Sequence, residues 1–191
     1  MASPAGNLNL FRYLYHSLSL SSGIVTHHKT NMVRAVKPQD IEAIRSIYNY
    51  DVMNTIITFE ATPVTTEEMD KRIKSVNSGF PWLVYERDGE VLGYAHASNW
   101  KSRCAYKLSV ESTVYLKAGE LKKGLGFQLY STLIKQLSTL GFHAVIAGIF
   151  LPNEASIALF ESGSQGLQVI ITNFYLIDFM FFSIKPNHRS N

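Results

Sequence analysis

Cysteine is almost absent from this chain, since Cys104 is the single one among 191 residues. One cysteine excludes a disulfide within the chain and any metal site built from several cysteines. This usage is typical of a protein made in a reducing compartment, so we expect a cytoplasmic location. His96 and His143 have no carboxylate or cysteine at the spacing of metal ligands, and we therefore assign no metal site.

Long apolar runs and a strong net charge are absent as well. The longest apolar stretch, Val169–Ile184, is interrupted by polar side chains, which argues against a transmembrane helix. The chain has 18 Lys and Arg against 15 Asp and Glu, a net charge of +3, and residues 32–161 carry fourteen of each sign. Such a neutral core lacks the basic field that nucleic-acid phosphates require. We therefore expect neither a nucleic acid nor a membrane as partner.

The N-terminal end lacks acidic residues, because no Asp or Glu occurs before Asp40. Residues 1–31 have no sustained apolar segment followed by a small-residue cleavage site, so a secretory signal is not predicted. Two interpretations remain: an organelle transit peptide, or a start codon upstream of the true one at Met32, which we favour. We predict an extension over 1–31 and one folded domain over 32–184, because 46% hydrophobic and 17% charged residues are typical of an ordinary single domain.

The hydrophobic pattern from Val33 onward predicts alternating strands and helices. A short strand precedes a helix that begins near Asp40, its expected N-cap. The apolar stripe expected on that helix consists of Ile41, Ile44, Ile47, Tyr48 and Val52. Thr65-Thr66-Glu67-Glu68 fits the capping box of a second helix. Trp82–Arg87 and Val91–Ala97 alternate like strands around an Asp-Gly turn, which is typical of a tight hairpin.

The next segments predict a strand, a loop and a helix in that order. Lys107–Leu116 alternates between apolar and polar residues and is expected to be a central strand. The polar loop Lys117–Gly126 leads to a helix with an apolar side that ends near Gly141. A buried strand over Ala144–Ile149 and a short helix after Asn153, its expected N-cap, follow. The order β-α-α-β-β-β-α-β-α predicts an α/β fold with a mixed central sheet flanked by helices.

The first candidate for chemistry is the run Lys122-Lys123-Gly124-Leu125-Gly126, placed between the predicted strand and helix. Glycines there let backbone amides turn toward an anionic group, and the start of a helix adds positive partial charge. The run has the spacing of neither a Walker loop nor a dinucleotide motif. A phosphate cradle and a simple glycine turn are therefore equally good interpretations of these residues alone.

The second candidate is Glu111, a carboxylate in a strand whose neighbours are mostly apolar or hydroxylic. Such surroundings raise the pKa of a carboxyl toward the range useful for a general base, although a solvated strand face is the commoner explanation. The third candidate is the loop Trp100-Lys101-Ser102-Arg103-Cys104-Ala105-Tyr106. Its two cations and two aromatic rings suit an anionic or zwitterionic small molecule, and an ordinary solvated loop is the alternative.

Taken with the order of elements, five stretches resemble the GNAT superfamily of acetyl-CoA-dependent N-acetyltransferases, and within it the phosphinothricin N-acetyltransferase group. They are Phe80-Pro81-Trp82-Leu83-Val84, Trp100-Lys101-Ser102-Arg103-Cys104-Ala105-Tyr106, Glu111-Ser112-Thr113-Val114-Tyr115, Gly124-Leu125-Gly126 and Leu151-Pro152-Asn153-Glu154-Ala155-Ser156. The resemblance covers about residues 32–161. It implies a sheet that is splayed at its centre to admit acetyl-CoA.

The resemblance also implies a role for individual residues. Acetyl-CoA would be the co-substrate, held by Val114, Tyr115, Leu116, Lys122, Lys123, Gly124, Leu125, Gly126, Phe127 and Asn153. Glu111 would take a proton from the substrate amine through water. The amino-acid pocket would be lined by Phe59, Arg103, Tyr106, Tyr115 and Tyr130.

Several positions depart from the family pattern. The family's usual Gln or Arg is Leu121 here, and a common glycine is Lys122. A His of the group is Phe160, the Leu-Gly-aromatic step after it is Ser162-Gly163-Ser164, and Gln165–Asn191 lacks the glycine-rich tail. Because phenylalanine cannot donate a proton, we expect this altered C-terminus to impair activity. A sharp loss of match at this point also suggests a changed reading frame or splice choice.

The sequence therefore predicts an N-acetyltransferase that moves acetyl to the amine of a small amino acid or a glutamate-like analogue, of the phosphinothricin or methionine sulfoximine type. Two alternatives stay open. One is a catalytically weak acyl-CoA-binding relative, and the other is an interaction protein that uses the apolar C-terminal strand as a partner edge. The sequence leaves the natural amine undecided, as well as whether two copies form a homodimer.

Overall fold

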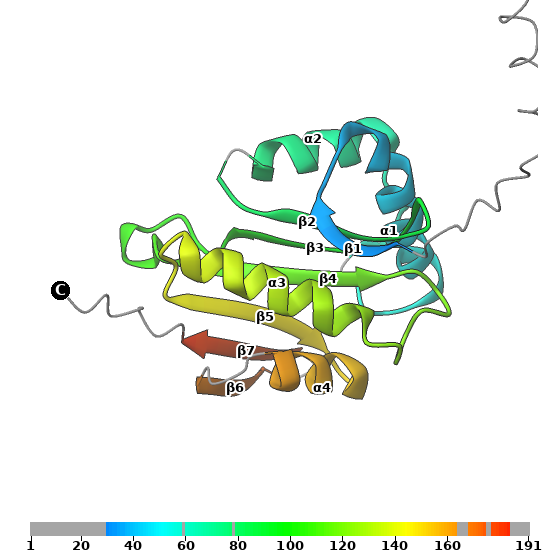
Figure 1. The fold of residues 1–191 in the computed structure, drawn as a ribbon. Coiled ribbons are helices and arrows are strands. Elements are labelled where there is room, and N and C mark those ends of the chain that lie inside the picture. The colour runs from blue at the N-terminus through cyan, green and yellow to red at the C-terminus, as the bar shows by residue number, and fades with distance from the viewer. Residues whose placement is uncertain (1–29, 59, 78, 164–167, 175–176, 184–191) are drawn as a thin grey trace, which may run out of the picture.

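Strands with alternating apolar side chains form one mixed sheet in the computed structural model, which describes residues 30–58, 60–77, 79–163, 168–174 and 177–183 (Figure 1). The strands are β1 (Asn31–Ala35), β2 (Trp82–Arg87), β3 (Glu90–Asn99), β4 (Ser109–Leu116), β5 (Ala144–Phe150), β6 (Gln168–Phe174) and β7 (Ile177–Ser183). The helices are α1 (Ile41–Asn54), α2 (Thr66–Asn77), α3 (Leu125–Thr139) and α4 (Glu154–Gly163), with 3-10 turns at Pro38–Asp40 and Cys104–Tyr106. The predicted order of elements and the α/β class are confirmed.

The sheet has the strand order β1-β2-β3-β4-β5-β7-β6, so β4 is its middle strand, as predicted. Neighbouring strands are antiparallel except for β4 and β5, which are parallel. The hairpin between β2 and β3 is confirmed, because Asp88 and Gly89 have φ angles of 52° and 85°, the left-handed values of a tight hairpin turn. β1 begins at Asn31, one residue before the start predicted for the folded domain.

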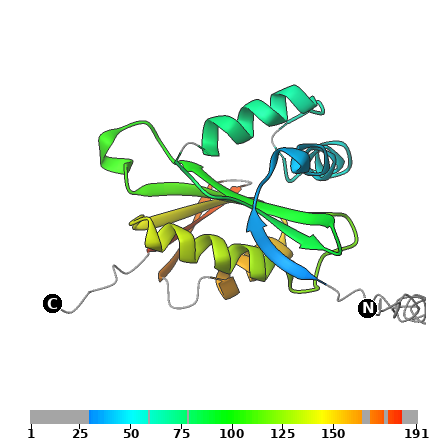
Figure 2. The same cartoon turned by 45° about the horizontal axis from the view of Figure 1, so that its top comes forward.

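Helices cover both faces of the sheet, and Figure 2 shows α1 and α2 on one side and α3 on the other. Between α3 and the sheet lies a core that includes Leu129, Leu133 and Val110. A second core, on the side of α1 and α2, includes Ile44, Trp82 and Tyr94. The alternation predicted for β4 divides it between the two faces, since Val110 belongs to the first core and Tyr115 packs against the second.

The C-terminal segment adds two strands to the sheet. These strands, β6 and β7, pair with each other. β7 lies between β5 and β6 and is antiparallel to both, so the strand that comes last in the described chain is not at the sheet edge. This part of the chain completes the sheet even where its sequence departs from the family pattern.

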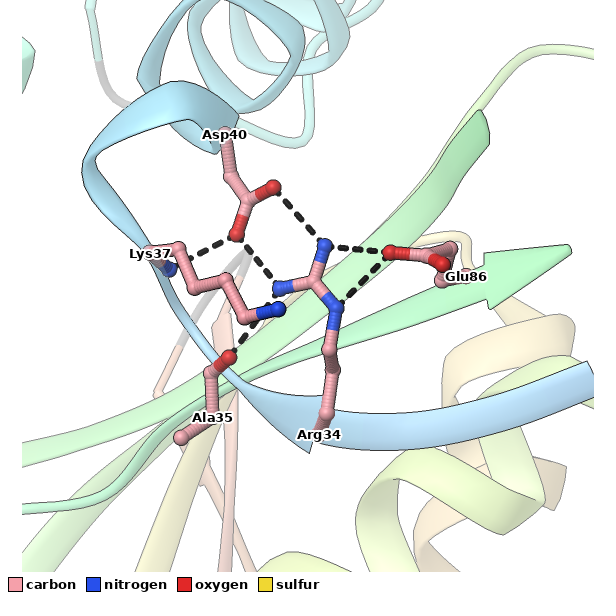
Figure 3. Close-up of polar contacts among 5 residues, drawn as sticks. All are labelled: Arg34, Ala35, Lys37, Asp40 and Glu86. Carbon is pink, nitrogen blue, oxygen red and sulfur yellow. Dashed lines mark hydrogen bonds and ion pairs between the residues drawn. The ribbon is translucent and has the colours of Figure 1, made fainter. Parts of the chain in front are cut away.

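The connection between β1 and α1 is held by a charged cluster (Figure 3). Arg34 donates to Asp40 over 2.7 and 2.9 Å, and its Nε donates to Glu86 over 2.8 Å. Asp40 is the N-cap residue of α1, as predicted, but its side chain makes no capping hydrogen bond. Asp40 precedes the helix, but its carboxylate accepts from Arg34 and from the Lys37 amide instead, because a fixed guanidinium offers a stronger charge-assisted bond.

Candidate active site

The gap between β4 and β5 is the first feature of the site. The two strands pair from Ser109 to Glu111 on β4, and in the described chain the pairing goes no further toward Leu116. At the point of divergence the Ser112 hydroxyl donates to the Ile146 carbonyl over 3.3 Å. β3 pairs with β4 from Val110 to Leu116, so within the described chain it is the β5 side of β4 between Ser112 and Leu116 that lacks a neighbouring strand. This is the central splay that the family resemblance implied.

The glycine loop leads from the open end of β4 to α3. Gly124 is the N-cap residue of α3 with φ 80°, and Lys122 also takes a left-handed φ of 60°. The ammonium of Lys123 donates to Glu120 over 3.0 Å, and Glu120 also pairs with Arg87 at 3.1 Å. The N-terminus of α3, a helix of fifteen residues, lies near Leu116 at the open end of β4, and the helix dipole there favours an anion.

Packing also explains why position 126 is a glycine, independently of any role in phosphate binding. A Cβ built on it would lie 3.2 Å from one methyl of Leu159 and 3.5 Å from a methyl of Leu116. Glycine therefore lets α3 approach both α4 and β4 closely. Leu125 is buried in the core as well, and Phe127 is half-buried, so these predicted cofactor-binding side chains serve mainly to seat the helix.

Glu111 is a half-buried carboxylate at the closed end of the splay. It pairs with Ser98 on β3 and with Ile146 on β5, and its side chain shares the α1 side of the sheet with that of Tyr115. Within the described residues its carboxylate makes no hydrogen bond or ion pair, and burial raises its pKa above the usual value. A carboxylate in such a setting can hold a proton taken from a nearby donor.

The loop between β3 and β4 lies beside Glu111, because Ser98 and Glu111 are paired where the loop begins and ends. Lys101, Arg103 and Tyr106 line a cavity of about 410 Å³ in this loop, together with Ser102. The Lys101 ammonium lies 5.2 Å from the ring centroid of Trp100 and 5.6 Å from that of Tyr106. The guanidinium of Arg103 is exposed, and the described part of the chain offers it no ion pair.

A group of tyrosines covers the sheet between α1 and Glu111. The rings of Tyr48 and Tyr115 meet edge to face at 5.3 Å, and those of Tyr94 and Tyr115 lie 5.5 Å apart. Asp51 lies one turn beyond Tyr48 on α1 and is 8% exposed. Sequence reasoning missed Asp51, since it placed Val52 on the apolar stripe, whereas the buried positions of α1 are Ile44, Ile47 and Asp51. The spacing could have indicated this position, because Asp51 lies seven residues, about two helical turns, after Ile44 and so on the same face of the helix.

Not every predicted site residue lies on the same side of the sheet as Glu111 and Tyr115. Tyr130 is fully buried in the core on the α3 side of the sheet, where its ring meets Phe160 edge to face at 4.8 Å. The structure therefore does not bring Tyr130 together with Glu111 or Tyr115, because helix α3 turns it toward the opposite face. Phe59 lies outside the described residues.

Asn153 begins α4 as predicted. Its side-chain oxygen accepts from the Ser156 amide over 3.1 Å, which is the bond of an N-cap. Its amide NH₂ makes no hydrogen bond to any described residue, so it can still donate to a ligand between β5 and α4. Val114 and Leu116 are half-buried at the splay, on the α3 side of β4.

A second cavity of about 450 Å³ lies between α1 and the β2–β3 hairpin. Arg34, Glu86 and Lys117 are among its lining residues, and none of the predicted site residues is. The described helices include none that is long and apolar enough to cross a membrane. Among the described residues no group of His, Cys, Asp and Glu is arranged to hold a metal ion.

Comparison with known proteins places these features in a family context. The family model "Acetyltransferase (GNAT) domain" matches residues 33–167. Phosphinothricin N-acetyltransferase from Streptomyces viridochromogenes is 37% identical over 130 residues, which are 68% of this chain and 71% of that protein. L-methionine sulfoximine/L-methionine sulfone acetyltransferase from Salmonella typhimurium is 36% identical over 134 residues, 68% of this chain and 77% of that protein.

A solved structure shows the same fold. Phosphinothricin acetyltransferase from Sinorhizobium meliloti, determined in complex with acetyl-CoA, aligns with a TM-score of 0.71 at 30% identity. The alignment covers 84% of this chain and 95% of that one.

Proposed function

This chain belongs to the GNAT acetyltransferase family, and we propose that it transfers acetyl from acetyl-CoA to the α-amine of a small amino acid or a glutamate-like analogue. Its relatives act on phosphinothricin and on methionine sulfoximine or sulfone, which are amino acids with a tetrahedral, oxygen-bearing side-chain end. The observation that carries the proposal is the open side of β4 with Glu111 at its closed end.

The residues around the splay fit acetyl-CoA. The unpaired edge of β4 from Val114 to Leu116 presents backbone amides and carbonyls of the kind that the pantetheine arm needs, and Asn153 has amide hydrogens left to donate. The amides at Gly124 and beyond suit the pyrophosphate, with Lys122 and Lys123 as nearby cations. When bound, acetyl-CoA supplies a thioester carbonyl carbon that a neutral amine can attack.

In our proposal Glu111 makes the amine neutral. An amino acid reaches the site as an ammonium ion, whose proton must leave before nitrogen becomes a nucleophile. Glu111 accepts that proton through a water molecule, and its raised pKa keeps the carboxylate basic enough for the transfer. The half-buried position limits competing solvent, which strengthens the interaction between the carboxylate and the ammonium.

The cavity in the loop between β3 and β4 suits the acidic part of the substrate. Arg103 offers a planar guanidinium that can bind a carboxylate, phosphinate or sulfonyl oxygen through two parallel bonds. Tyr106 and Lys101 add a hydroxyl and a second charge to the same wall. An amino acid with one further polar oxygen group is therefore the class of substrate that we propose.

We infer a slower reaction than in relatives that have a proton donor on α4. Phe160 occupies that position, is 5% exposed and packs against Tyr130. Phenylalanine cannot reprotonate the leaving thiolate, and a general acid typically contributes ~10²–10⁴ in rate. The tail still supplies β6 and β7, so the loss concerns proton transfer and not completion of the sheet.

Two measurements on the full chain test the proposed function. Calorimetric titration with acetyl-CoA is expected to show binding, and a free-thiol assay against a panel of amino acids is expected to show turnover with phosphinothricin or methionine sulfoximine. Binding without turnover would favour the weak acyl-CoA-binding relative. Neither binding nor turnover would favour the interaction protein.

A further inference from the structure

A buried acid on α1 has no role in the reaction described above. Asp51 occupies the third buried position of the helix after Ile44 and Ile47, so its carboxylate points at the sheet and not at solvent. Two aspartates in the described residues are this deeply buried. Asp40 is held by Arg34, which compensates its charge, whereas Asp51 has no such cation.

The carboxylate of Asp51 is unpaired in the described part of the chain. The hydrogen bonds at this residue go to its backbone carbonyl, which accepts from the amide of Thr55 over 3.0 Å and from the hydroxyl of Thr55 over 2.7 Å. Arg72, whose guanidinium lies over the Tyr48 ring, already pairs with Glu60 at 2.7 Å and with Glu68 at 2.5 Å. A buried charge is kept unpaired only at a free-energy cost, and such groups gather where ligands bind.

The walls around Asp51 are aromatic. Tyr48, one turn earlier on α1, meets Tyr115 edge to face, and Tyr115 lies against Tyr94. Burial raises the pKa of all three phenols, so they stay neutral and present ring faces and hydroxyls. Aromatic rings around a carboxylate form a surface that attracts an ammonium ion, through cation–π contacts as well as charge. The guanidinium of Arg72 already lies 5.7 Å from the centroid of the Tyr48 ring, but Glu60 and Glu68 compensate its charge, so the place still favours a cation.

Tyr115 connects this acid to the splay. It lies on the same side of β4 as Glu111, two alternations along the strand, and both carboxylates act electrostatically on its hydroxyl. Burial raises the pKa of Asp51 to about 6, so it is mainly ionised at neutral pH and gains from a cation that enters.

We propose that Asp51 is a substrate-binding carboxylate that captures the ammonium form of the amine against the Tyr48 and Tyr115 rings, before Glu111 takes the proton. The assignment rests on the proposed acetyl transfer for its biological meaning, but the binding itself needs no turnover. It divides two tasks between two acids, with Asp51 setting affinity for a cationic amine and Glu111 setting the rate.

Asp51→Asn tests the proposal, because asparagine has nearly the same shape and no charge. The chain saturated with CoA, which has no acetyl to give, is titrated calorimetrically with L-methionine sulfone and with N-acetyl-L-methionine sulfone, whose nitrogen is uncharged. Loss of a charged hydrogen bond is expected to weaken binding of the free amine about 10- to 100-fold and to leave binding of the acetylated compound unchanged. In turnover assays the KM for the amine rises by a similar factor while kcat stays within about twofold.

Asp70→Asn is the matched control, since it removes an equal charge from a carboxylate on α2 that pairs with Lys74 at the surface. Circular dichroism checks that each variant folds. Asp51→Leu is a second variant that removes the charge, with an apolar side chain like those of its neighbours. Equal binding of the free amine to wild type and Asp51→Asn overturns the proposal while leaving the proposed function intact. Charge-dependent binding of the amine at Asp51 without any turnover supports the proposal and refutes acetyl transfer. Weakened binding of both compounds assigns Asp51 a structural role and overturns the proposal.

Discussion

Asp51→Asn is expected to make the protein more stable at alkaline pH. Burial raises the pKa of the folded carboxyl from its usual 3.8 to about 6, with no cation beside it. Each pKa unit corresponds to about 1.4 kcal/mol at 25 °C, so ionised Asp51 destabilises the folded chain by about 3 kcal/mol above pH 6. Asparagine carries no charge and removes this contribution.

The stability of wild type relative to Asp51→Asn is expected to change with pH in one direction. As pH falls from above 6 toward 3.8, folded Asp51 gains its proton before unfolded Asp51 does, so the wild-type chain is stabilised relative to the variant. Below 3.8 both states are protonated and the difference becomes constant. The tyrosines that face Asp51 from α1, β3 and β4 titrate far above this range and do not contribute.

Urea denaturation at pH 8, 6 and 4.5 measures the effect. The free energy of unfolding of Asp51→Asn minus that of wild type is expected to be largest at pH 8 and to shrink by most of its value at pH 4.5. The difference between the two chains cancels the titration of every other group. A difference that is the same at all three pH values would show that Asp51 is not a buried, unpaired charge.

Other residues give predictions of different kinds. Arg103→Lys is expected to raise the KM for the amino acid and to leave the KM for acetyl-CoA unchanged, because a point charge replaces a planar fork; equal effects on both would indicate a structural role. Arg34→Met leaves Asp40 and Glu86 without their cation and is expected to lower the free energy of unfolding by about 3–5 kcal/mol, measured by thermal or urea unfolding. A change under about 1 kcal/mol would show that the cluster does not stabilise the position of α1. Gly126→Val is expected to lower the unfolding midpoint as well as acetyl-CoA affinity, because its side chain would meet α4 and β4; full stability with full affinity would contradict both roles.

The parts of the fold that depend on local pattern were predictable from sequence. The hairpin follows from an Asp-Gly turn between alternating strands, and the middle strand follows from the alternation of Lys107–Leu116. β4 and β5 are parallel neighbours joined by α3, a connection of the length that parallel strands need. The hairpin and the strand alternation are decided within a few residues of chain.

Features that depend on packing between distant segments were not predictable in the same way. Asp40 is the N-cap residue of α1 but makes no side-chain capping bond, because Arg34, on another element, reaches its carboxylate. Tyr130 was expected in the amine pocket, yet the rotation of α3 on the sheet turns it to the far side. Asp51 was overlooked because a helical stripe drawn through Val52 differs from the buried one by a single position. Each case concerns the direction of one side chain, which tertiary contacts determine.

The central claim is that this chain moves acetyl to an amino-acid amine with the carboxylate of Glu111 as base. The direct measurement is mass-spectrometric detection of N-acetyl-L-methionine sulfoximine, with release of CoA thiol, by wild type and by Glu111→Gln at neutral pH. Wild type is expected to form the product with one thiol per acetyl transferred. Glu111→Gln is expected to react ~10²–10⁴ times more slowly, with acetyl-CoA affinity unchanged and with a smaller loss at high pH, where more amine is already neutral. Absence of product from wild type, or equal rates for the two chains, would contradict the account.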